Sequence, residues 1–142
     1  MRWLLSGFVL AAFAAVALAA PGLPVHKAPA GARVYIISPA DGASVGRDVT
    51  VRFGLVGMGV APAGVEKEHT GHHNLLVDVA TLPAAGQPIP NDEHHKHFGG
   101  GQTETVVHLS PGAHTLQLEL GDANHVPFDP PVVSKRITIH IK

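Results

Sequence analysis

The histidines are the residues of this chain whose type and spacing could do chemistry. The sequence has 142 residues and 11 histidines but no cysteine. They gather in short segments: EKEHTGHHN contains His72 and His73, NDEHHKHFGGG contains His95 and His97, and GDANHVPFDPP contains His125. Imidazole is the commonest metal ligand in proteins and changes charge near neutral pH. These segments predict a metal site if the fold brings them together.

The triplet His95-Lys96-His97 is the sharpest local signal. In an extended segment, residues i and i+2 project from one face about 7 Å apart, so two imidazoles can approach one ion. Lys96 and His94 then share the opposite face, which makes His94 the poorer candidate.

His72 and His73 are adjacent, so on a strand they face opposite sides. His73 runs in phase with Leu75 and Val77, which predicts that it faces the core or its rim. We expect one of the two histidines to reach a given ion. The alternative for His73 is a buried ring that hydrogen-bonds a backbone carbonyl.

His125 lies in a loop, where Asp122 and Asn124 favour a turn and Pro127 follows. The other histidines have structural explanations: His26 lies in a leader, while His108, His114 and His140 lie on strands. The candidate metal ligands are therefore His72, His73, His95, His97 and His125. Asp78 or Asp129 are candidates to orient a ring.

The types of ligand atom that the chain offers limit which metal ions it can bind. There is no thiolate, and Met58 is the only methionine beyond the initiator, so a soft Cu(I) site is poorly supported. Imidazoles with an optional carboxylate suit Cu(II), Zn(II) or Ni(II). The expected cofactor is a copper or zinc ion.

The N-terminus predicts a signal peptide over residues 1–19. Arg2 is followed by an apolar run over residues 4–16, and Ala17-Leu18-Ala19 suits cleavage after Ala19. The apolar run is shorter than the roughly 20 residues that cross a bilayer, so no membrane insertion of the mature chain is expected. We expect a periplasmic or secreted protein with a flexible leader over residues 20–32, rich in Pro, Ala and Gly.

Residues 33–142 have the pattern of one all-β domain. Apolar alternation or β-branched runs predict six strands, with a seventh around 95–98; the six are 33–38, 48–55, 72–80, 103–109, 114–120 and 132–141. The class favoured is an immunoglobulin-like antiparallel β-sandwich of six to seven strands, with a small barrel as the alternative. Three long connections carry or border the histidines: 57–71, 81–91 and 121–131.

Charge and motifs exclude or weaken several functions. Ten Lys+Arg against 11 Asp+Glu, with no basic run, argue against a nucleic-acid partner. There is no G-x-S-x-G, no H-E-x-x-H and no cysteine nucleophile, so enzyme chemistry finds little support. Four carboxylates could still act as a base beside a metal; these are Asp92, Glu93, Asp122 and Asp129. Gly99-Gly100-Gly101 is interpreted as a turn between strands.

Four ordered segments, GLVGMGVAPAG, TGHHNLLVD, HKHFGGGQTET and GDANHVPFDPP, resemble an uncharacterised family of short bacterial periplasmic proteins with a domain of unknown function. The resemblance extends from about Gly54 to Ile141. It implies export and a compact β domain, with no established activity. In that pattern histidine is common where this chain has Asn74 and Phe128, so two further ligands would be missing here. The shared positions include His72, His73, His95, His97 and His125.

A second resemblance concerns the N-terminal segment YIISPADGASVGRDVTVRFGL. It is similar to the opening strands of immunoglobulin-like domains in periplasmic copper-handling proteins. This likeness concerns the fold and favours the metal hypothesis only slightly.

The function predicted is an exported β domain whose histidine-lined loops bind a divalent transition metal, copper or zinc, for carriage or buffering. Its partner would be the metal ion or an unknown small ligand. One alternative is a non-catalytic recognition or structural module of the cell envelope, with hydrogen-bonded loop histidines. The other is a metal-dependent hydrolase.

Overall fold

The computed structural model describes residues 21–142, so the predicted signal peptide lies outside the described residues. The described part is built from nine strands and contains no helix, hence none that could span a bilayer. The strands are β1 Arg33–Ser38, β2 Ser44–Val45, β3 Asp48–Val56, β4 Gly59–Val60, β5 Thr70–Val77, β6 His95–His97, β7 Glu104–His108, β8 Gly112–Gly121 and β9 Ile137–Ile141.

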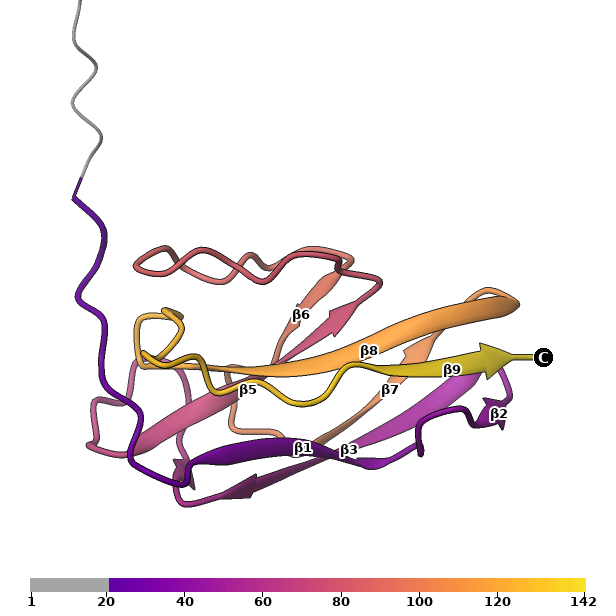
Figure 1. Ribbon diagram of the computed structural model, residues 1–142, viewed down its shortest axis with the longest axis horizontal. Helices are drawn as coiled ribbons and strands as arrows, with labels where there is room; N and C mark the ends of the chain where they lie inside the picture. The colour runs from indigo at the N-terminus through magenta and orange to yellow at the C-terminus, as the bar shows by residue number, and fades with distance from the viewer. Residues whose placement is uncertain (1–20) are drawn as a thin grey trace, which may run out of the picture.

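The strands form two sheets that lie face to face (Figure 1). One has the order β1-β3-β7, and the other has the order β2-β9-β8-β5-β4, with β6 also paired to β5. The predicted antiparallel β-sandwich is confirmed, because every pairing between the longer strands is antiparallel. The two-residue strands β2 and β4 pair in parallel and are too short to show a period in the sequence.

The alternating residues that the sequence analysis placed inward form the core. Val49, Val51 and Phe53 of β3 meet the apolar residues of β8 and β9 between the sheets. The latter are Leu116, Leu118, Leu120, Ile137, Ile139 and Ile141. Each such side chain contributes about 1.5–3 kcal/mol through burial, so the core holds the scaffold rigid without a disulfide.

Strand β5 is buried on both faces, unlike an ordinary strand of a sandwich. Every residue from Gly71 to Val77 is buried. His73 shares its face with Leu75 and Val77, which belong to the core between the sheets. His72 shares the outer face with Asn74 and Leu76. Polar groups on that outer face are therefore shielded from water as if they were in the core.

The long connections provide this cover. The segment between β5 and β6 passes over the sheet in Figure 1, and the amide of Ile89 donates to the carbonyl of His125 at 2.7 Å. Leu76, Ile89 and Val126 are buried outside the main core cluster. They make the outer face of β5 a second, smaller buried region.

Glu119 of β8 belongs to this outer face, because it pairs with Asn74 across the strands. Its side chain is fully buried, and neither carboxylate oxygen has a hydrogen-bond partner within the described chain. Burial raises the pKa of Glu119 to about 7. At neutral pH, a large share of the protein molecules therefore has Glu119 in its neutral, protonated form.

The stretch before β1 lies against the domain. The amide of Leu23 donates to the carbonyl of Gly86 at 2.9 Å, and Ala28 and His26 exchange backbone hydrogen bonds with Asp129 at 3.1 and 2.9 Å. These contacts place residues 22–28 beside the loop that carries His125. Flexibility of the leader over residues 20–32 stays a prediction.

Candidate metal centre

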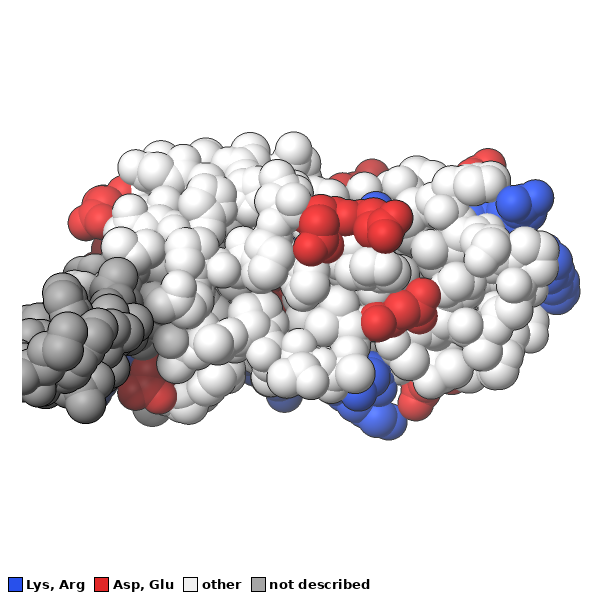
Figure 2. Space-filling model, turned by 90° about the horizontal axis from the view of Figure 1, so that it is seen from above, with Lys and Arg blue, Asp and Glu red and all other residues white. Residues whose placement is uncertain are grey.

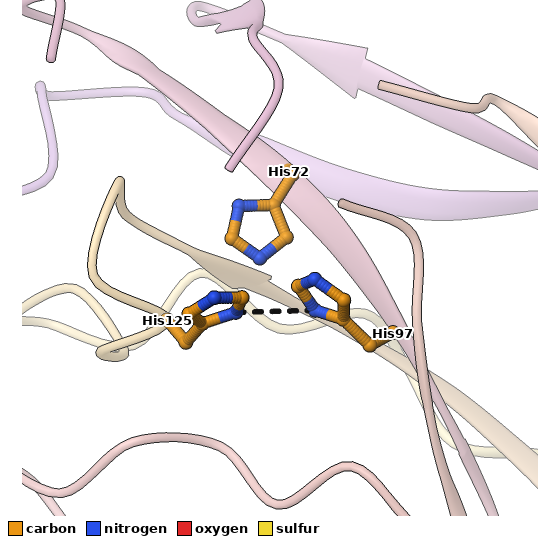
Figure 3. Close-up of side chains that lie close together, drawn as sticks. All are labelled: His72, His97 and His125. Atoms are coloured by element: carbon orange, nitrogen blue, oxygen red, sulfur yellow. Dashed lines mark hydrogen bonds between the residues drawn. The ribbon is translucent and has the colours of Figure 1, made fainter. Parts of the chain in front are cut away.

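Three histidines from three separate segments meet at one point. His72, His97 and His125 each offer a ring nitrogen, and the three nitrogens lie within 4.8 Å of one another. Figure 3 shows the three rings turned toward a common space. The Nδ1 atoms of His97 and His125 are 3.2 Å apart, and the ring centroids are separated by 4.2 to 5.1 Å. Within residues 21–142 this is the one group of three or more potential ligands.

The sheet positions two of these rings directly. His72 lies on β5, and β6 pairs with β5 so that His97 is opposite Asn74. His72 and Asn74 face the same side, so His97 lies diagonally across from His72. Diagonal neighbours of this kind are within reach of long or aromatic side chains.

The third ring arrives from the loop after β8. His72 pairs with Gly121 at the end of β8, so the chain leaves the sheet beside the site. His125 adopts a left-handed backbone with φ of 64°. Asp122 stabilises this turn, because its Oδ1 accepts hydrogen bonds from the amides of Asn124 and Val126 at 2.8 and 2.9 Å.

Two glycines leave room for the rings. A Cβ on Gly99 would overlap the Nε2 atom of His97, so the absence of a side chain there sets the position of that ring. A Cβ on Gly121 would lie 3.3 Å from the Nε2 atom of His72, which is a tight contact. Gly99 was interpreted from the sequence only as part of a turn. The structure shows that it also shapes the histidine cluster.

The electrostatics favour neutral rings. His72 is completely buried, and neither of its ring nitrogens has a hydrogen-bond partner among the described residues. Burial, and then the neighbouring His97 and His125, lower the pKa of His72 to about 4. Burial, followed by His125, also lowers the pKa of His97. At neutral pH His72 and His97 are thus neutral and can offer lone pairs.

The structure places the other two candidates elsewhere. His73 faces the core, 5.1 Å from the ring of Phe53, and burial lowers its pKa to about 4. His95 is turned to Asp92, whose Oδ1 lies 2.9 Å from the Nδ1 atom of His95. Neither residue belongs to the cluster of three. The two ends of the His95-x-His97 pair therefore have different partners.

A second cluster contains residues of a hydrolytic triad, but its geometry is different. The Nδ1 atom of His114 is 2.7 Å from Asp78, and its Nε2 atom is 3.4 Å from the hydroxyl oxygen of Ser110. The same Nε2 atom lies closer, at 2.8 Å, to the carbonyl oxygen of Ser110, which can only accept a hydrogen bond. The hydrogen bond with Asp78 raises the pKa of His114. This ring is a hydrogen-bond donor at both nitrogens, unlike the base of a triad.

Asp78 and Asp129 do not orient the clustered rings through any hydrogen bond of their side chains that the structure shows. Asp78 binds His114 and the amide of Thr115, and Asp129 pairs with the leader through its backbone. Asn74, and not Asp78 or Asp129, is placed to orient a ring of the cluster, since its Oδ1 lies 3.3 Å from the Nδ1 atom of His97. Its position at i+2 from His72 was the sequence signal for this contact.

Comparison with known protein families matches residues 51–142 to "Domain of unknown function (DUF4399)". The chain belongs to this family. The match confirms the resemblance to an uncharacterised family, and it includes His72, His97 and His125. No curated protein and no solved structure matches the chain. DUF4399 thus brings no activity of its own, and the chemistry of the three histidines must be argued from their geometry.

Proposed function

We propose that this DUF4399 protein is exported and binds a divalent transition metal, copper or zinc, through His72, His97 and His125, for carriage or buffering of the ion. One observation carries the proposal: three imidazole nitrogens from three segments lie within 4.8 Å of one another. Ligands about 2.0–2.1 Å from a tetrahedral ion are about 3.3 Å apart. The 3.2 Å between the Nδ1 atoms of His97 and His125 suits that spacing.

The unpartnered nitrogens of His72 support metal binding over a purely structural role. A buried polar group without a hydrogen bond costs roughly 1–3 kcal/mol, and structural histidines are normally hydrogen-bonded. Both nitrogens of His72 lack such a partner within the described chain. An ion bound to one of them would compensate this cost. His73 likewise lacks side-chain hydrogen bonds within the described chain, so it is the position of His72 beside His97 and His125 that favours an ion there.

The surroundings also favour a cation. The Asp122 carboxylate acts against the other influences and raises the pKa of His72, so it stabilises positive charge at the cluster. On the face shown in Figure 2, acidic side chains lie near the middle while most Lys and Arg side chains lie toward the margin. The middle of this face carries no concentration of Lys and Arg side chains.

The three histidines fill three positions of a tetrahedral ion and leave the fourth to a neutral or exchangeable ligand. An exchangeable ligand suits a carrier, because a ligand of the recipient can take its place before the histidines release the ion. The export part of the proposal rests on the sequence of residues 1–19, which has the features of a signal peptide. Expression of the full chain followed by fractionation and N-terminal sequencing tests it, with Ala20 as the expected first residue.

Isothermal titration with Zn(II) and with Cu(II) tests the metal site. The wild-type protein is expected to bind about one ion with a Kd below about 10 µM, and His97→Ala with His125→Ala is expected to abolish binding. His95→Ala is the matched control, because this histidine lies on the same strand and points to Asp92. Absence of binding in the wild type, or equal binding in the double variant, would exclude this site.

A further inference from the structure

Asn74 is a polar side chain of the outer face that contacts the histidine cluster through His97. It is completely buried on β5, between His97 on one neighbouring strand and Glu119 on the other. Its Nδ2 atom is 3.5 Å from the carbonyl oxygen of Glu119, and its Oδ1 atom is 3.3 Å from the Nδ1 atom of His97. The amide end therefore faces a carbonyl acceptor, and the oxygen faces the cluster.

The tautomer of His97 follows from these contacts. Its Nε2 atom lies against the backbone of Gly99, so the Nδ1 atom is the end that faces the cluster. That Nδ1 atom is shared by two neighbours, the Oδ1 of Asn74 at 3.3 Å and the Nδ1 of His125 at 3.2 Å. An amide oxygen can only accept, so the hydrogen bond between Asn74 and His97 forms in the tautomer of His97 that carries its proton on Nδ1.

A metal ion that coordinates His97 through Nδ1 requires the neutral tautomer with its proton on Nε2. The proton therefore moves from Nδ1 to Nε2, and the hydrogen bond to the Asn74 oxygen is lost. An ion held by both atoms would lie about 2 Å from each, off the line that joins them. The 3.3 Å between the oxygen and Nδ1 matches the separation of about 3.3 Å between two such ligands.

We propose that the side-chain oxygen of Asn74 is the fourth ligand of the ion, and that the resulting set of three nitrogens and one oxygen selects four-coordinate Zn(II) or Cu(II) over Cu(I). This inference rests on the proposed metal site. An amide oxygen is a hard donor and contributes little to a soft monovalent ion, whereas it suits a divalent ion of borderline softness. All four donors are uncharged, and the Asp122 carboxylate acts on His72 as a nearby negative charge.

The test compares Asn74→Leu, which removes the oxygen at nearly constant volume, with Gln117→Leu. Gln117 lies on the same outer face of β8, two residues from Glu119, and its side-chain amide donates to the carbonyl oxygen of Ser134 at 2.9 Å. Each protein is titrated with Zn(II) and, through competition with a Cu(I) chelator, with Cu(I). Co(II) in place of Zn(II) reports the coordination number through its visible absorption.

Asn74→Leu is expected to weaken Zn(II) binding by tenfold or more, to change Cu(I) binding by less than threefold, and to alter the Co(II) spectrum. Gln117→Leu is expected to leave all three unchanged. Asn74→Asp serves as the second variant if Asn74→Leu does not fold. It keeps an oxygen in place, so it is expected to bind Zn(II) at least as tightly as the wild type with a four-coordinate Co(II) spectrum.

Two results would overturn the inference while leaving the three-histidine site intact. One is a Co(II) spectrum of Asn74→Leu identical to that of the wild type, even with weaker binding, because Asn74 would then only position His97. The other is weaker Zn(II) binding by Asn74→Asp. A wild-type protein that binds no divalent ion would instead contradict the proposed function itself.

Discussion

The Nδ1 atoms of His97 and His125 lie 3.2 Å apart although 28 residues separate them in the sequence. One ring stands on a three-residue strand, and the other stands in a loop with a left-handed backbone. Two protonated rings at this distance would repel each other, so the pair favours the neutral form of at least one ring. The lowered pKa of His97 agrees with this arrangement.

Gly99→Ala is expected to weaken metal binding by tenfold or more, although it replaces none of the proposed ligands. The new Cβ would overlap the Nε2 atom of His97 and push that ring out of the cluster. Crowding of this kind costs about 1–3 kcal/mol of folding free energy as well. Gly100→Ala is the control, because its Cβ would meet only the flexible end of Gln102. Titration with Zn(II) and urea unfolding measure both effects, and equal affinity in the two variants would contradict the prediction.

Asp122→Ala is expected to weaken metal binding through the loop of His125 and through loss of the negative charge that acts on His72. The carboxylate accepts hydrogen bonds from the amides of Asn124 and Val126, which the variant would leave without partners. The same carboxylate contacts His26 of the leader at 2.7 Å. His26→Ala keeps the loop bonds intact and is expected to change affinity less than threefold. If both variants weaken Zn(II) binding equally, the leader contact and not the loop sets the position of His125.

Glu119→Gln is expected to stabilise the metal-free protein, and more so at higher pH. The folded-state pKa of about 7 exceeds the ordinary 4.5, so the folded protein holds a proton that the unfolded chain has lost. Stability from this group is complete below about pH 4.5 and falls as the pH rises through 7. Glutamine cannot ionise, so it removes the loss of stability that ionisation of the buried Glu119 causes. The gain in unfolding free energy measured by urea titration should be roughly 2 kcal/mol larger at pH 8 than at pH 5. A gain independent of pH would show that Glu119 titrates normally.

Asp78→Asn is expected to destabilise the protein most at mildly acidic pH. Asp78 raises the pKa of His114, so this pair contributes stability that is complete below the unfolded pKa and is lost as the pH rises through the folded pKa. Asparagine keeps an acceptor for the amide of Thr115, but it removes the charge and replaces the Oδ2 acceptor of His114 with an NH2 donor. Thermal unfolding at pH 6 and pH 9 measures the difference. A melting temperature lowered equally at both values would mean that the loss is not electrostatic.

Much of the scaffold could be predicted from local patterns. The alternation Val49-Val51-Phe53 and Leu116-Leu118-Leu120 identified the core faces, because the side-chain period of a strand is two. The same rule placed His73 toward the core and His72 on the other face. Bounds differed by a few residues where strands end in loops, as for β9, which begins at Ile137 and not at 132. In the predicted first part of this strand, residues 132–136, Val133 forms only an isolated bridge with Glu119.

The histidine segments themselves were evident in the sequence, and their identity limits the chemistry to imidazole ligands without a thiolate. Which of five histidines converge was decided by the tertiary structure, because the pairing of β5 with β6 and β8 sets which ring lies beside His72. The H-x-H pattern could not show that Asp92 holds His95, since that hydrogen bond depends on the turn before β6. Likewise, burial of the outer face by distant loops, and not any local signal, leaves His72 neutral, without a hydrogen-bond partner among residues 21–142, and beside His97 and His125.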